Sequence, residues 1–137
     1  MPINAITPKT LDAAEAAVTP GQPVYMLNLL RYREQALYDG PVTAPPCTGR
    51  EAYHERYIPA FRRLAAGRSA QRLFAGPLLA KLVGPDGARW HVAALNEYAD
   101  FATFRAIVDT DAYRREVEPH RLAALDDFRL FALDKTL

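Results

Sequence analysis

The sequence predicts an α+β fold of the ferredoxin-like type, with the order β-α-β-β-α-β behind an extra N-terminal helix. Three observations support this prediction: four apolar runs typical of strands, two stretches with apolar residues at helical spacing, and a short glycine-containing turn between the second and third strands. The order favours a four-stranded antiparallel sheet with helices on one face. The 137 residues suit one core, and we assign residues 1–22 to a helical extension and 23–137 to the sheet domain.

The extension is expected to form a helix over residues 7–18, with Thr10 as its N-cap, because alanine, leucine and glutamate favour helix there. The sequence TPGQP (19–23) ends this helix, since glycine and two prolines cannot continue it. The first strand follows at 24–32, with the sequence VYMLNLLRY. Its nearly continuous apolar character implies that both of its faces are covered.

A loop at residues 34–49 contains three prolines and two glycines, and loops of this length are often lids or binding loops. Thr48 and Glu51 have the spacing of a capping box, which begins the next helix. Pro59 falls inside this helix, and we expect it to kink the helix or to end its regular part. An apolar stripe at helical spacing is formed by Tyr53, Tyr57, Phe61 and Leu64.

The second strand is expected over residues 70–84, with a bulge or an edge position at Gly76 and Pro77. The turn at 84–87 (GPDG) is short, so this strand should pair as a hairpin with a third strand at 89–98. We assign no phosphate-binding role to the turn, because a strand and not a helix follows it.

The second half of the chain predicts a helix over 99–108, capped by Asp100, with helical structure continuing through 109–118. Pro119 opens a last short turn, and a strand at 127–135 completes the sheet.

All four predicted strands carry apolar residues on both faces, so the face away from the helices needs a cover. A second copy of the chain, related by a twofold axis, is the most economical cover. Two sheets that face each other would enclose a barrel-like space that could hold a small ligand. The sequence therefore predicts a homodimer with a small-molecule cavity between the sheets.

Composition and charge argue against several classes of function. The net charge of +1 gives no field that recruits nucleic acid, and we interpret the pairs Arg62-Arg63 and Arg114-Arg115 as solvated helix faces. No apolar run approaches the ~20 residues of a membrane span, and the N-terminus lacks the pattern of a secretory signal. One cysteine, Cys47, excludes an internal disulfide framework. We expect a cytoplasmic protein that binds neither nucleic acid nor membrane.

Several motifs recur in a known family: the strand VYMLNLLRYRE, the helix start GREAYHERYIPAF, and the segment from Trp90 to Leu133 with its tryptophan-opened strand and HR ending. Over residues 23–133 the chain resembles the bacterial domain-of-unknown-function family thirteen-thirty, of the dimeric α/β-barrel superfamily. The resemblance implies a ferredoxin-like dimer with a ligand cavity. Relatives in the superfamily include antibiotic-biosynthesis monooxygenases, lactone isomerases, polyketide cyclases and chlorite dismutase-like haem enzymes, so the fold does not transfer a function.

Asn28 lies in the middle of an apolar strand, where an unpaired amide would cost about 1–3 kcal/mol. Two roles are open for it: an amide satisfied by neighbouring backbone or by the second copy, and a donor that orients a ligand in the cavity. Tyr32 shares the face of Asn28 by alternation. On the third strand, Trp90 and Asn96 share one face and are further candidates for ligand contact.

Three other candidates for ligand contact have structural alternatives. Arg31 lies on the face opposite Asn28, where a salt bridge between elements competes with a role in binding a carboxylate. Tyr53 and Tyr57 lie on the helical stripe, where core packing competes with a hydroxyl at the cavity mouth.

Two histidines are the candidate catalytic residues, because an imidazole can transfer protons near neutral pH. His91 lies in the third strand, and a solvent-edge histidine is the alternative. His120 and Arg121 belong to the HR ending, and the alternative is a helix-end pair in which Arg121 bridges Asp126 or Asp127.

No cofactor or metal is predicted. The three histidines, His54, His91 and His120, stand on three elements without ligand spacing, and no haem-specific motif is present. The sequence thus predicts a cofactor-independent enzyme acting on a small organic acid, lactone or phenolic compound. A small-molecule-binding protein without turnover is the alternative, and a structural protein with a filled cavity is a third possibility.

Overall fold

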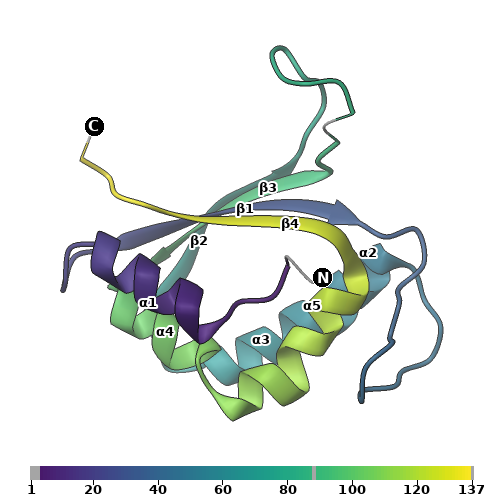
Figure 1. The fold of residues 1–137 in the computed structure, drawn as a ribbon, viewed down its shortest axis with the longest axis horizontal. Helices are drawn as coiled ribbons and strands as arrows, with labels where there is room; N and C mark the ends of the chain where they lie inside the picture. The colour runs from purple at the N-terminus through teal and green to yellow at the C-terminus, as the bar shows by residue number, and fades with distance from the viewer. Residues whose placement is uncertain (1–3, 88, 137) are drawn as a thin grey trace.

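The computed structural model describes residues 4–87 and 89–136. Residues 1–3 of the predicted N-terminal extension, and residues 88 and 137 of the predicted sheet domain, lie outside the described residues. Four strands form one antiparallel sheet in the order β2-β3-β1-β4, and all the helices lie on one side of it (Figure 1). The strands are β1 (Val24–Tyr32), β2 (Ala70–Pro77), β3 (Val92–Tyr98) and β4 (Leu125–Leu133). This confirms the predicted α+β fold, and the strand order is that of the ferredoxin-like arrangement.

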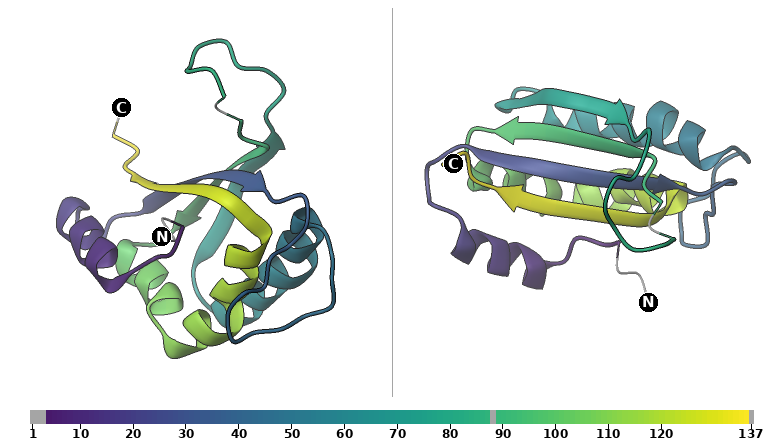
Figure 2. Two further views of the ribbon diagram at one scale, coloured as in Figure 1. Left: turned by 45° about the vertical axis from the view of Figure 1, so that its right-hand side comes forward. Right: turned by 90° about the horizontal axis from the view of Figure 1, so that it is seen from above.

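The helices lie on the lower side of the sheet in Figure 1, and the view from above shows α1 (Pro8–Ala17) beside the edge strand β4 (Figure 2). The helical layer begins with α1 at the N-terminus. One long helix between β1 and β2 consists of α2 (Gly49–Glu51), the π-helical segment η1 (Ala52–Tyr57) and α3 (Ile58–Ala65). The helices between β3 and β4 are α4 (Phe101–Val108), the π-helical segment η2 (Tyr113–Val117) and α5 (Glu118–Ala124).

The two π-helical segments share a sequence pattern and a cause. The amide of Ile58 donates to the carbonyl oxygen of Tyr53, five residues earlier, and the amide of Glu118 donates to the carbonyl oxygen of Tyr113 in the same way. In both cases a proline follows the donor directly, and proline has no N–H to continue the α-helical pattern. Pro59 was expected to kink the helix or to end its regular part. In the structure the helix continues through Pro59, and the regular α-helical pattern is interrupted by the π-helical segment before it.

Local signals placed two helix starts correctly, whereas β3 begins three residues later than predicted and β4 begins and ends two residues earlier. Thr48 and Glu51 form the predicted capping box, and the carboxylate of Asp100 accepts from the amide of Thr103. The cap of α1 was wrongly predicted: Thr7, and not Thr10, is the N-cap, and the two threonines form a capping box together.

The second strand differs from the prediction in length and in the site of its irregularity. β2 ends at Pro77, and a long loop, not a tight turn, leads to β3. The register shift falls between Arg72 and Phe74, not at Gly76 and Pro77, although β2 is an edge strand as expected. Arg72 lies opposite Asn96, whereas Phe74 lies opposite Leu95, so the bulge turns these two side chains to different faces of the sheet.

The two faces of the sheet have different surroundings. Alternate residues of β1 point to the helices and are buried, among them Met26 and Leu30, each 2% exposed. The opposite face, which we call the open face, carries partly exposed aromatic and aliphatic side chains such as Phe74, Phe131 and Leu133. The β2–β3 loop projects on the open-face side of the sheet (Figure 1) and exposes further large apolar side chains, namely Leu79, Leu82 and Val83.

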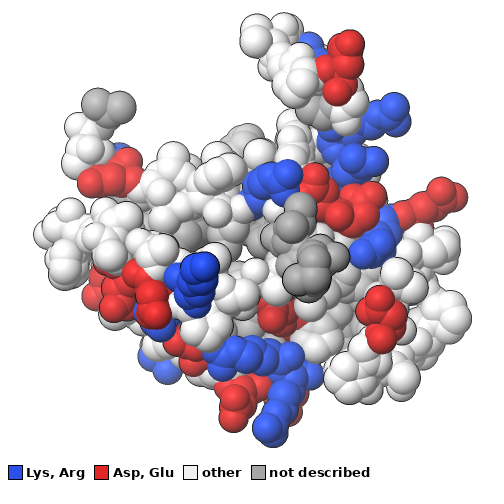
Figure 3. Space-filling model, in the orientation of Figure 1, with Lys and Arg blue, Asp and Glu red and all other residues white. Residues whose placement is uncertain are grey.

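The N-terminal segment packs against the rest of the helical layer. Leu11 of α1 is buried in the common core, and Arg105 of α4 forms an ion pair with Asp12 at 2.8 Å. The division at residue 22 stays a prediction. In the part of the chain that the structure describes, no helix is long and apolar enough to cross a membrane. Positive and negative side chains are interspersed on the face seen in Figure 3.

Candidate functional site

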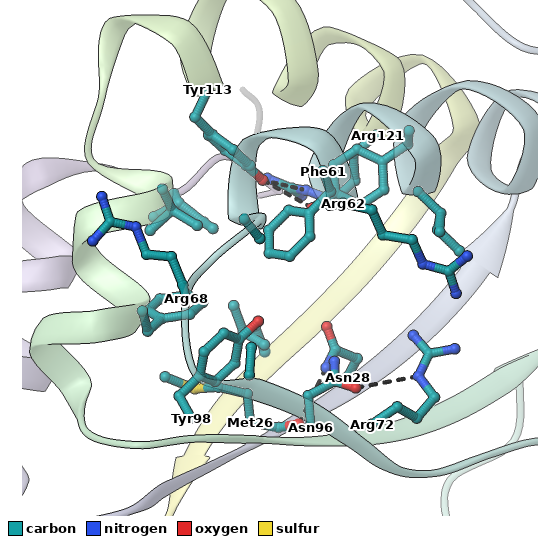
Figure 4. A pocket seen from close by; sticks show the side chains of 18 of the residues that line it. Met26, Asn28, Phe61, Arg62, Arg68, Arg72, Asn96, Tyr98, Tyr113 and Arg121 are labelled. Atoms are coloured by element: carbon teal, nitrogen blue, oxygen red, sulfur yellow. Dashed lines mark hydrogen bonds between the residues drawn. The ribbon is translucent and has the colours of Figure 1, made fainter.

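A pocket of about 290 Å³ lies between the helical layer and the sheet. Met26, Asn28, Asn96 and Tyr98 line it from the sheet, and Phe61 and Arg62 of α3 line it from the helices (Figure 4). The predicted cavity lay on the other face, between two sheets. This pocket therefore differs in place from the predicted cavity, although Asn28 belongs to it.

The side chain of Asn28 is held so that its oxygen faces the pocket. Its Nδ2 donates to the carbonyl oxygens of Met26 at 3.2 Å and of Ala94 at 3.4 Å. Because both partners are acceptors, the nitrogen of the amide must point to them, and this leaves Oδ1 for the pocket (Figure 4). The protein backbone thus provides the partners that this amide needs, and the pocket gains a fixed hydrogen-bond acceptor.

Two arginines converge at one side of the pocket. Arg72 comes from β2 and Arg62 from α3, and their guanidinium groups point toward each other (Figure 4). The Nε of Arg72 donates to Oδ1 of Asn96 at 3.2 Å, which orients the guanidinium group. Arg68 also lines the pocket, and its guanidinium group lies on the opposite side in the same view.

The most buried charged group of the pocket wall is Arg121, which is 1% exposed. It donates to Glu118 at 2.7 Å, to the hydroxyl oxygen of Tyr113 at 3.4 Å and to the carbonyl oxygen of Asn4 at 2.6 Å. The alternative that Arg121 bridges Asp126 or Asp127 is therefore wrong. Because the protein satisfies all three nitrogens of Arg121, this side chain stabilises the wall and does not wait for a ligand.

Three tyrosines of the pocket, Tyr53, Tyr57 and Tyr98, are neutral at neutral pH because their pKa values are raised. Burial raises the pKa of Tyr98 to about 12, while the positive charge of Arg72 opposes this rise. Burial likewise raises the pKa of Tyr53 and of Tyr57. Their hydroxyl groups can therefore donate hydrogen bonds, but they are poor proton acceptors for catalysis.

A second polar cluster surrounds Tyr32, outside the pocket lining. The hydroxyl of Tyr32 lies 2.5 Å from Nε2 of His54, and the backbone amide of Tyr32 donates to Nδ1 of His91 at 2.9 Å. The ring of His91 stacks on that of Tyr32, with 5.5 Å between centroids, and the guanidinium group of Arg50 lies 4.6 Å from the same centroid. Burial, and then the charge of Arg50, lower the pKa of His54.

The other candidate base, His120, contacts the loop at residues 34–49. Its Nδ1 lies 2.8 Å from the hydroxyl oxygen of Tyr38, which also accepts from Arg56 at 3.3 Å. The amide of Leu37 donates to the carbonyl oxygen of Ala123, so backbone contact fixes the same part of the loop. Burial lowers the pKa of His120, and Arg56 lowers it further. We call the contact of His120 with Tyr38 and Arg56 the loop anchor. The structure thus places His120 in the loop anchor and not in the pocket.

Two more predicted site residues lie away from the pocket. Arg31 forms an ion pair with Asp126 at 3.3 Å, which is the structural alternative stated for it. Trp90 precedes β3 and does not share a face with Asn96 in the strand; the guanidinium group of Arg129 lies 5.4 Å from its ring centroid.

The sequence prediction and the pocket agree for some residues only. The pocket brings together Asn28, Asn96, Tyr53, Tyr57 and Arg121. Lining residues that the sequence analysis missed include Arg62, Arg68, Arg72, Tyr98 and Tyr113. The only signal for Tyr113 was its position six residues before a proline, which Tyr53 shares. Among the described residues, no group of three or more His, Cys, Asp or Glu side chains has the geometry of a metal site.

Comparison with known proteins gives structural neighbours. No protein-family model and no curated protein matches the chain. It is similar to a crystal structure of the methylated RPA0582 protein, with 28% identity and a TM-score of 0.78 over 100% of this chain and 98% of the other. It is also similar to the RPA0582 protein of unknown function from Rhodopseudomonas palustris, with 31% identity and a TM-score of 0.72 over 94% of this chain and 93% of the other.

Proposed function

The chain belongs to the same family as the Rhodopseudomonas palustris protein of unknown function, and from this premise we propose that it binds a small organic molecule in the pocket between its helices and its sheet. The observation that carries the proposal is the orientation of Asn28. Its amide nitrogen is satisfied by two backbone carbonyl groups, so that its oxygen is presented to the pocket. A ligand with a hydroxyl or N–H group can donate to this oxygen while its apolar part packs on Phe61 and Tyr98.

Binding without turnover accounts for the lining better than catalysis does. Among the described residues that line the pocket there is no histidine, aspartate or glutamate. His91 and His120 have partners elsewhere, in the Tyr32 cluster and the loop anchor. A cofactor-independent enzyme that acts on a small acid, lactone or phenol would need a positioned base, and the described residues that line this pocket do not provide one.

The finer predictions from the sequence remain part of this proposal. They are membership of family thirteen-thirty, a cytoplasmic location, and a homodimer that buries the open face. Support for the dimer comes from the exposed fractions of Phe74 (61%), Phe131 (48%) and Leu133 (41%), because large apolar side chains exposed on both edge strands of one sheet face are typical of an interface.

The test uses a panel of small phenols and their methyl ethers, which differ in the hydrogen that Asn28 would accept. We expect phenols to raise the melting temperature of the wild type by several degrees at 100 times the dissociation constant, where binding adds about 2.7 kcal/mol. Asn28→Leu should lose the preference for the phenols over the ethers. Ala65→Trp should fill the pocket and abolish binding, whereas Ala66→Trp, at an exposed position outside the lining, is the matched control.

Three results would contradict the proposal. One is a melting temperature that no compound changes. Another is a phenol whose binding survives Ala65→Trp, because the ligand would then lie elsewhere. The third is Asn28→Leu failing to fold, which would make Asn28 a structural hydrogen-bond hub.

A further inference from the structure

The charge of the pocket lining is one-sided. Four arginines line it, namely Arg62, Arg68, Arg72 and Arg121, and no carboxylate does so among the described residues. Arg121 has its own carboxylate partner, Glu118. In the described part of the chain, neither Arg62 nor Arg72 takes part in an ion pair, whereas Arg31, Arg105, Arg114 and Arg129 all do.

Arg62 and Arg72 lie next to irregularities in two separate elements. Arg72 lies opposite Asn96 on the helix side of the edge strand, and the bulge that follows it turns Phe74 to the open face. The π-helical segment η1 precedes α3 and sets the rotation at which Arg62 meets the sheet. Two guanidinium groups that converge repel each other, and an anion placed between them removes this repulsion.

Arg72 is also oriented for a planar anion. Asn96 accepts from its Nε, which leaves the two terminal nitrogens for another acceptor. A carboxylate can accept from such a pair of nitrogens with both of its oxygens. The field of Arg72 reaches the interior of the pocket: burial raises the pKa of Tyr98 and of Tyr53, and the charge of Arg72 acts against both shifts.

We propose that the pocket selects a small organic carboxylate, with its acid group between Arg62 and Arg72 and its hydroxyl or N–H group at Asn28. This inference rests on the proposed function, since it names the class of ligand for the same pocket. Arg72 lies across β3 from Met26, and Asn28 is two residues further along β1, so the backbones of Arg72 and Asn28 are roughly 12 Å apart. A gap of this size suits a compact hydroxy acid whose apolar middle lies over the sheet.

The test compares 4-hydroxyphenylacetate with 4-hydroxyphenylacetamide, together with further matched pairs of hydroxy acids and their primary amides, by titration calorimetry. The wild type should bind the acid of a matched pair at least about 10-fold more tightly than the amide, and added salt should reduce this preference. The double variant Arg62→Gln/Arg72→Gln should bind acid and amide equally. The matched control Arg63→Gln/Arg115→Gln removes two exposed arginines outside the lining and should keep the preference.

A second variant separates charge from geometry. Arg72→Lys keeps the positive charge but loses the paired nitrogens and the contact to Asn96, so it should keep only part of the preference. Circular dichroism and the melting temperature check that each variant is folded.

The possible failures point to different errors. Equal binding of acid and amide by the wild type, abolished for both by Ala65→Trp, would overturn the choice of a carboxylate and leave the proposed pocket standing. A preference for the acid that survives Arg62→Gln/Arg72→Gln would place the anion elsewhere and would also overturn the inference. No binding of any acid or amide, with phenols still raising the melting temperature of the wild type, would overturn this inference alone; if no compound of either panel binds, the proposed function fails as well.

Discussion

The hydroxyl oxygens of Tyr57 and Tyr113 lie 3.0 Å apart, and this buried hydrogen bond joins the two π-helical regions. Tyr57 ends η1, and Tyr113 begins η2. The hydroxyl of Tyr113 also accepts from Nε of Arg121. A chain of buried polar groups therefore runs from one helix through the other to Glu118, and it forms part of the pocket wall.

Removing the hydroxyl in the middle of this chain should cost more than removing the one at its end. Tyr113→Phe leaves both Tyr57 and Nε of Arg121 without a partner, and we expect a loss of about 1–3 kcal/mol in the free energy of unfolding. Tyr57→Phe leaves Tyr113 paired with Arg121, so its loss should be smaller, about 1 kcal/mol. Urea denaturation measures the free energy of unfolding of both variants. Equal losses would contradict the expectation that the hydroxyl of Tyr113 supports two partners and that of Tyr57 only one.

The buried ion pair of Arg121 and Glu118 should be sensitive to removal of one partner. Glu118→Gln leaves a buried guanidinium group without its counter-charge, and we expect destabilisation of about 3–5 kcal/mol. Replacing both partners, as Glu118→Leu/Arg121→Met, should recover much of this loss. The exposed pair of Lys81 and Asp86 is the control, and Asp86→Asn should not change the denaturation midpoint measurably. A double variant as unstable as Glu118→Gln would argue against this explanation.

Stability should fall on mild acidification because of two histidines. Burial lowers the pKa of His54 and of His120 from the ordinary value of 6.5, so the unfolded chain binds these protons more readily than the folded one. Their contribution is complete above pH 6.5, and it is lost as the pH falls from there to the lowered pKa values. Melting temperatures at a series of pH values measure the effect. A double variant, His54→Gln/His120→Gln, should show a flatter profile in this window, and an unchanged profile would exclude these two groups as the cause.

The open face provides a test of the predicted dimer. Phe131→Glu places a charge among the exposed apolar side chains of the sheet and should shift the chain from dimer to monomer in sedimentation experiments. Leu37→Glu is the matched control, because Leu37 is 50% exposed and Phe131 is 48% exposed, but Leu37 lies in the loop before α2. A wild type that sediments as a monomer would contradict the homodimer.

The sequence predicted those features that neighbouring residues determine. The Asp100 cap, the Thr48 and Glu51 capping box and the strand of Asn28 depend on a few adjacent side chains, and the structure confirms them. The ferredoxin-like order follows from the sequence of elements, because few topologies satisfy it. The prediction that β2 extends to residue 84 failed because a strand end is set by pairing with its neighbour, which the local pattern of β2 does not contain.

The arginine pair could not be predicted, for a geometrical reason. With strict alternation, Arg72 and Phe74 would share a face, and only the bulge separates them. Arg62 was interpreted as part of a solvated helix face, and it is indeed exposed, but the sequence did not show that it also lines the pocket. Side chains repeat on one face every two residues in a strand and every 3.6 residues in an α-helix. Each irregularity adds one residue, so the residues after it no longer follow this repeat. The pocket is lined by Arg72, directly before the bulge, and by Arg62, which follows η1.

The segment η1 lets this helix lose one residue with little effect on the parts that flank it. A π-helical turn is closed by a hydrogen bond over five residues and holds about one residue more than an α-helical turn, so loss of one residue from 52–57 would let the segment become an ordinary α-helix without turning its two flanks relative to each other. Gly49 would therefore keep its place against the carbonyl oxygens of Arg33 and Ala124, where a Cβ atom would collide with the backbone. A single-residue gap at 52–57, seen when related sequences are aligned, is thus compatible with an unchanged pocket, whereas a gap in α3 would turn Arg62 by about 100° around the helix axis.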